Sequence, residues 1–80
     1  MTDQEILSRL DNIVADVLDL GSLHLTTQTV ASEVEGWDSL NHVRIVVAVE
    51  EAFRVRFSTA EIQGLKSVGD LVSLIARKAT

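Results

Sequence analysis

The sequence contains no cysteine and no proline, and aromatic residues make up only 4% of its 80 residues. The absence of cysteine excludes a disulfide framework and a thiolate metal site. His24 and His42 are the only histidines, so a structural zinc site would depend on carboxylates, and we predict no metal site. The lack of proline and the scarcity of aromatic residues favour helices over a β-sandwich.

Long apolar segments and a basic N-terminus are also missing. The longest unbroken apolar run, Ile45 to Val49, is far too short to span a bilayer. The first residues are acidic and polar, unlike the basic start of a signal peptide. We therefore predict a cytoplasmic protein with no membrane span. The net charge of −5 argues against a nucleic-acid partner, because such proteins need a basic patch for the phosphates.

The charge is unevenly distributed along the chain. Residues 1–38 contain eight acids and one base, whereas residues 39–80 contain four acids and six bases. A solvated acidic first helix is one interpretation. The other is an acidic surface that attracts basic partners by electrostatic steering.

Capping signals and periodicity predict the helices. Thr2 and Glu5 form a capping box that starts a helix at about Asp3, and Gly21 is its predicted end. Its apolar stripe consists of Ile6, Leu10, Ile13 and Val17, widened by Leu7, Val14 and Leu18. Residues 21–38 show no period and predict a long loop pinned by scattered apolar side chains; loops of this length are often functional.

The second helix is predicted from Ser39 to Phe53, with Asp38 or Ser39 as its N-cap. A helical wheel separates two apolar stripes. The predicted core stripe is Ile45, Val46, Val49 and Phe53; the opposite stripe is Leu40, Val43 and Val47. The second stripe is either covered by a short helix or forms a docking surface, because a small bundle helix usually buries one stripe.

Two further helix starts complete the fold. Ser58 and Glu61 open a short helix that ends near Gly64, and Ser67 precedes a last helix whose apolar residues include Leu71. We predict an all-α fold: a small four-helix bundle of three longer helices and one short helix, with a long loop between the first and second. Residues 1–80 form one domain.

Ser39 is the candidate functional residue. Most serines at helix starts are simply N-caps, but this one follows a long loop, and a helix N-terminus favours a covalently attached phosphate. Asp38 stands beside the hydroxyl. Ser39, His42 and Asp38 are also the residue types of a hydrolase triad, but all three lie within one helical turn, where relay geometry is not expected. His42 is expected to pack or cap, and Trp37 to anchor the loop through a polar partner of its N–H.

The segment Gly36-Trp37-Asp38-Ser39-Leu40 resembles the acyl carrier protein family. The resemblance continues through residues 43–53, which are similar to the family's apolar helix ending in Glu-Glu-x-Phe, and through Phe57, Glu61, Ile62 and residues 67–71. It covers nearly the whole chain in the expected order and spacing.

The resemblance implies that Ser39 receives 4′-phosphopantetheine from coenzyme A through a phosphopantetheinyl transferase, and that the adjacent Asp38 supports the modification. The arm would carry an acyl group as a thioester, and the protein, a monomer, would be a carrier without a catalytic site. The implied partners are acyl-loading, ketosynthase or acyltransferase-type enzymes that dock on the second helix at Leu40, Asn41, Val43, Arg44, Val47, Glu50 and Glu51. Core residues Val49, Phe57, Ile62 and Leu71 would shelter the acyl chain.

Departures from the family pattern bear on the pathway. Fatty-acid carriers have an acidic start to the second helix, whereas this chain has Asn41 and Arg44 there. We therefore predict a dedicated carrier in a polyketide, modified-acyl or lipid biosynthetic pathway. The alternatives are a peptidyl or aminoacyl carrier, disfavoured because Gly-Gly does not precede the serine, and a non-carrier helical interaction module.

Overall fold

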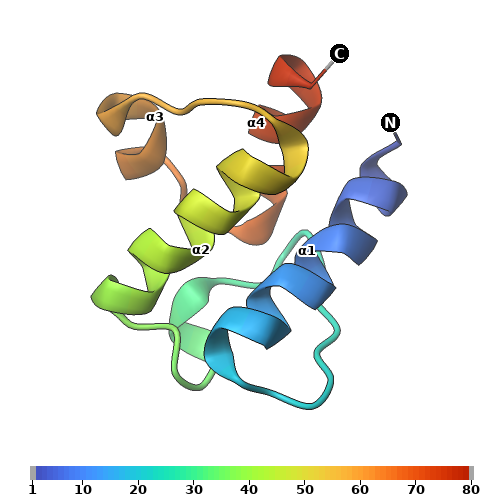
Figure 1. Cartoon of the computed structure of the whole chain (residues 1–80), viewed down its shortest axis with the longest axis vertical. Coiled ribbons are helices and arrows are strands. Elements are labelled where there is room, and N and C mark those ends of the chain that lie inside the picture. The colour runs from blue at the N-terminus through green and yellow to red at the C-terminus, as the bar shows by residue number, and fades with distance from the viewer. Residues whose placement is uncertain (1, 80) are drawn as a thin grey trace.

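The computed structural model describes residues 2–79, and within that range it contains four α-helices and no strand. The elements in chain order are α1 (Asp3–Leu18), the 3-10 helix η1 (Ala31–Glu33), α2 (Ser39–Phe53), α3 (Thr59–Gln63) and α4 (Val68–Lys78). α2 and α4 both run back alongside α1, opposite to its direction (Figure 1). The predicted fold of three longer helices, one short helix and a long first loop is confirmed.

The predicted capping boxes are present. Thr2 Oγ1 accepts the Glu5 N–H at 3.1 Å, and the Glu5 carboxylate accepts the Thr2 N–H at 2.9 Å. Ser58 and Glu61 form the same reciprocal pair at the start of α3, at 3.1 and 2.8 Å. Each box satisfies two backbone donors that the helix leaves without a carbonyl partner, which is why the helices begin where the motifs occur.

The predicted end of the first helix at Gly21 is wrong. α1 ends at Leu18, and Asp19 adopts the left-handed conformation at φ 57°, with its N–H bonded to the carbonyls of Ala15 and Asp16. Aspartate tolerates this region better than most residues, so no glycine is needed. Arg54, at φ 56°, ends α2 in the same way.

The core lies between α1, α2 and α4. All four residues of the predicted α2 core stripe are buried. On α1 the buried residues are Ile6, Leu10 and Val14, whereas Ile13 and Val17 are half-buried. The buried face of α1 therefore runs through Ile6, Leu10 and Val14 and contacts both α2 and α4.

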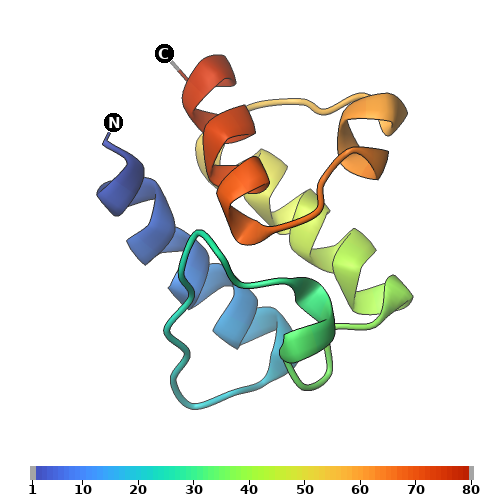
Figure 2. The same ribbon diagram turned by 180° about the vertical axis from the view of Figure 1, so that it is seen from behind.

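The long loop is fastened to two helices. Leu25 is buried, and its N–H donates to Asp11 Oδ1 of α1 at 2.7 Å. Further along, the carbonyls of Thr29 and Thr27 accept the N–H groups of Val68 and Gly69 at 2.8 and 2.9 Å. The tip of the loop consequently lies beside the first turn of α4 (Figure 2). These contacts fix the path along which the chain arrives at α2.

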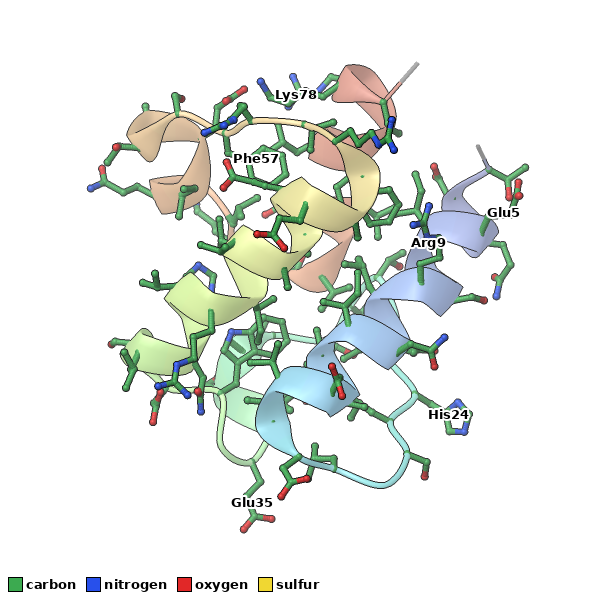
Figure 3. The ribbon with its side chains drawn as sticks, viewed as in Figure 1. Glu5, Arg9, His24, Glu35, Phe57 and Lys78 are labelled. Carbon is green, nitrogen blue, oxygen red and sulfur yellow. The ribbon has the colours of Figure 1, made fainter. Side chains whose placement is uncertain are left out.

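One arginine ties α1 to the far end of α2. The Arg9 guanidinium lies 4.5 Å from the centroid of the Phe53 ring, and its Nη2 donates to the Ala52 carbonyl at 3.0 Å (Figure 3). The guanidinium therefore covers Phe53, one of the two phenylalanines of the chain. None of the helices in residues 2–79 combines the length and apolar character needed to cross a membrane.

Candidate functional site

Ser39 is the first residue of α2 and is exposed. The N-cap is Asp38, whose Oδ1 accepts the Asn41 N–H at 2.8 Å. Within residues 2–79 the Ser39 hydroxyl has no hydrogen-bond partner. The serines that precede α3 and α4 differ, because Ser58 and Ser67 use their hydroxyls to cap the helix. Of the two predicted caps, Asp38 takes the role, and this leaves the Ser39 hydroxyl free to react.

The turn before Ser39 is held by its own hydrogen bonds. Gly36 has φ 87°, a conformation that disfavours any side chain. Its carbonyl accepts both the Asp38 N–H at 2.9 Å and Asn41 Nδ2–H at 2.8 Å. The Trp37 N–H donates to the Val34 carbonyl at 3.2 Å. The backbone therefore enters α2 at a fixed angle, with Ser39 on the outside.

Trp37 and His42 form a side-chain pair beside Ser39. Trp37 Nε1–H donates to His42 Nδ1 at 3.1 Å, and the ring centroids lie 6.2 Å apart with planes 28° from parallel. Trp37 is thus the predicted loop anchor with a polar partner for its N–H. His42 supplies that partner, which the residue spacing does not reveal.

The same pair differs from a hydrolase triad. In a triad, the histidine Nδ1–H donates to the aspartate. Here His42 Nδ1 is an acceptor, and the Asp38 carboxylate accepts a backbone N–H of its own helix. Asp38, Ser39 and His42 therefore lie close together without forming the triad's hydrogen-bonded relay.

An open depression lies beside the Ser39 hydroxyl. Its lining residues are Ala31, Trp37, Asp38, Ser39 and His42. Trp37 and His42 also line a second hollow, of about 40 Å³, that reaches Leu65 and Leu71. A hollow of this size holds no more than a few water molecules. Of the four residues predicted to shelter an acyl chain, only Leu71 lines it.

The second apolar stripe of α2 is uncovered. Leu40, Val43 and Val47 are 63%, 59% and 47% exposed. Arg44 and Glu51 are exposed on the same helix. The two remaining residues of the predicted partner surface make internal bonds instead: Asn41 holds the Gly36 carbonyl, and Glu50 Oε2 accepts the Phe57 N–H at 2.9 Å.

Comparison with known proteins gives the family. Residues 8–75 match the family model described as a phosphopantetheine attachment site. The acyl carrier protein of Prochlorococcus marinus (strain MIT 9515) is 33% identical over 78 residues, which cover 98% of both chains. The chain belongs to the acyl carrier protein family. The acyl carrier protein of Acidothermus cellulolyticus is 36% identical over 76 residues, covering 95% of this carrier and 90% of that protein.

The fold of this carrier is shared with a solved relative. The solution NMR structure of holo acyl carrier protein from Geobacter metallireducens superposes with a TM-score of 0.84 at 39% identity, covering 90% of this carrier and 83% of that chain. The prosthetic group of the family, covalently bound 4′-phosphopantetheine, is therefore the cofactor of this carrier. A free, exposed hydroxyl next to an open depression fits a tethered arm of this kind.

Proposed function

We propose that residues 1–80 act as one acyl carrier domain in the cytoplasm, and that Ser39 is the residue to which 4′-phosphopantetheine is attached. The observation that carries this proposal is the free Ser39 hydroxyl at the exposed start of α2, where the neighbouring Asp38 takes over the cap. In the modification, Ser39 Oγ forms a bond to phosphorus of coenzyme A. The bond to the adenosine bisphosphate half breaks, and the hydroxyl proton is released.

The arm supplies the thiol on which an acyl group is held as a thioester. The contribution of the protein is to hold the attachment point outward on a rigid turn and to offer partner enzymes a surface beside it. In this proposal it needs no catalytic site of its own. A phosphopantetheinyl transferase modifies the carrier, and acyl-loading, ketosynthase or acyltransferase-type enzymes use it.

The docking surface in this proposal is the uncovered face of α2. Its apolar part is Leu40, Val43 and Val47, all more than 45% exposed, and Arg44 and Glu51 supply charge beside them. Asn41 and Glu50 contribute to this surface indirectly. Asn41 binds the Gly36 carbonyl before α2, and Glu50 binds the Phe57 N–H after it. An exposed apolar stripe with a charged border is typical of a protein contact.

The pathway in this proposal is a dedicated polyketide, modified-acyl or lipid biosynthetic one. It is supported by Asn41 and Arg44, which stand where general fatty-acid carriers have an acidic start to the second helix. Arg54 and Arg56 add two exposed positive charges beyond the helix end. A partner of this carrier would therefore present carboxylates toward α2, because opposite charges across an interface favour the matching partner. Such complementarity contributes more to specificity than to affinity.

Intact mass spectrometry tests the attachment site. After co-expression with a transferase of broad specificity, the wild-type chain should gain the mass of one arm, and Ser39→Ala should gain none. Ser58→Ala is the matched control, since Ser58 also precedes a helix but caps it with its hydroxyl. Ser58→Ala should gain one arm. A mass gain that persists in Ser39→Ala would refute the assignment of Ser39.

A further inference from the structure

The Trp37–His42 hydrogen bond determines where the imidazole carries its proton. An indole N–H only donates, so His42 Nδ1, at 3.1 Å, must offer its lone pair. The neutral ring therefore holds its proton on Nε2. Trp37 thus keeps neutral His42 in the tautomer that carries its proton on Nε2. The Nε2–H group can then donate a hydrogen bond.

This Nε2–H has no acceptor within residues 2–79. His42 is half-buried and lines the same depression as Ser39. A half-buried donor without an acceptor is unfavourable once water is displaced from it. The ring is therefore suited to a ligand that brings an acceptor into the depression.

The position of His42 on α2 brings this donor close to any group on Ser39. The two residues are three apart, a spacing that places their Cβ atoms about 5–6 Å from each other on one side of a helix. Helical side chains lean back over the preceding turn. The contact of His42 with Trp37, five residues earlier, shows that this ring does so. Because Ser39 and His42 line the same depression, a phosphodiester on Ser39 would enter the space beside this ring.

Two donors near the helix start are already used, whereas the backbone N–H groups of Ser39 and Leu40 have no acceptor within residues 2–79. The Asn41 N–H is taken by the Asp38 carboxylate, and Asn41 Nδ2–H by the Gly36 carbonyl, both at 2.8 Å. Asp38 also places a negative charge beside the position of the phosphodiester, which weakens the attraction of the helix N-terminus for an anion. A phosphodiester at Ser39 can therefore accept from the free backbone N–H groups of the first turn, and His42 offers a further donor from the side of the depression.

We propose that His42, held by Trp37 in its Nε2–H form, binds the phosphodiester through which the arm is attached to Ser39. This rests on the proposed function, because it takes Ser39 as the attachment point. His42 is a positioning residue: it directs the first bonds of the arm over the depression and away from the apolar stripe of Leu40 and Val43. The docking face of α2 then stays open while the arm is in place.

NMR of the uniformly ¹⁵N-labelled protein, with and without the arm, tests this directly at a pH of about 8. The Nε2–H signal of His42 should shift when the arm is added, and its solvent exchange should slow roughly tenfold or more, as expected for a hydrogen bond to a charged group. His24 is the internal control. It is exposed and projects from the long loop, away from the start of α2 (Figure 3), so its signals should not change.

Two variants of the modified protein separate the two ring nitrogens. His42→Asn keeps an acceptor near the Nδ1 position and lacks the Nε2 donor, whereas His42→Gln keeps a donor near Nε2 and lacks the Nδ1 acceptor. The ³¹P signal of the phosphodiester should move in His42→Asn and stay near the wild-type position in His42→Gln. The indole N–H of the single tryptophan should respond in the opposite pattern, which also shows that each variant is folded.

The outcomes distinguish this proposal from the one on which it rests. Intact mass first shows whether Ser39 carries the arm. A chain that gains no arm overturns both proposals. A chain that gains the arm, with an unshifted His42 Nε2–H and the same ³¹P signal in wild type and His42→Asn, overturns the His42 assignment alone.

Discussion

Replacing Gly69 by alanine tests whether the loop that leads to Ser39 depends on its contact with α4. A Cβ at this position would lie 2.6 Å from the Thr27 carbonyl oxygen and 3.1 Å from Thr27 Cβ. The first distance is far inside van der Waals contact, and the oxygen belongs to backbone that cannot rotate away. The same carbonyl accepts the Gly69 N–H at 2.9 Å. The loop must therefore retreat, and that hydrogen bond weakens with it.

The expected loss combines opposing terms. Overpacking costs about 1–3 kcal/mol, and a weakened hydrogen bond about 1 kcal/mol more. Alanine recovers about 1 kcal/mol, because glycine is unfavourable inside a helix. We expect a net destabilisation of about 1–3 kcal/mol, which lowers the melting temperature by roughly 4 °C or more for a domain of this size.

Urea denaturation followed by Trp37 fluorescence measures this loss. Gly21→Ala is the control, because a Cβ there meets nothing within 4 Å, and its stability should change little. If Gly69→Ala were as stable as Gly21→Ala, the loop would not be held against α4 at this point, and the close packing described above would be wrong.

Three other predictions concern α2 and α3. Arg44→Glu should impair acyl transfer with the cognate partner while Ser39 is still modified; unchanged partner kinetics would show that Arg44 is only a solvated residue. Ile45→Ala, at a fully buried position, should lose about 2–5 kcal/mol in urea denaturation, whereas Val43→Ala should change stability by no more than about 0.5 kcal/mol; equal losses would contradict the assignment of the two faces of α2. The Ser58 N–H, and then Lys78, lower the pKa of Glu61 from its ordinary 4.5. The contribution of ionised Glu61 to the stability of the fold is therefore present above pH 4.5 and is lost as pH falls through the lowered pKa. Glu61→Gln should accordingly be less stable than wild type near neutral pH and equal to it in acid. A stability difference that does not depend on pH would refute the role of the charge.

Much of the fold was predictable because its signals are local. The starts of α1 and α3 follow from side chains that bond to backbone three residues away, so Thr2 and Ser58 mark them in the sequence. The core face of α2 follows from helical periodicity for the same reason. The end of α1 was not predictable in this way, since Asp19 and Gly21 both permit a left-handed residue and only packing selects between them.

The details of the site depended on long-range structure. Ser39 was identifiable from its motif, but its free hydroxyl depends on Asp38 taking the cap. The Trp37–His42 bond spans the junction between a loop and a helix, where no fixed periodicity relates residues five apart. The position of Trp37 is set by a loop that is itself held by Asp11 and by the first turn of α4. No local sequence pattern predicts such a series of contacts.

The arrangement of the helices also affects how this carrier can be joined to other molecules. The first turn of α1 and the last turn of α4 lie at the same end of the molecule as the end of α2, opposite the end where α2 begins (Figures 1 and 2). A linker, an affinity tag or a solid support attached at either of those turns leaves Ser39 pointing outward. An immobilised or fused carrier should therefore still be modified and acylated.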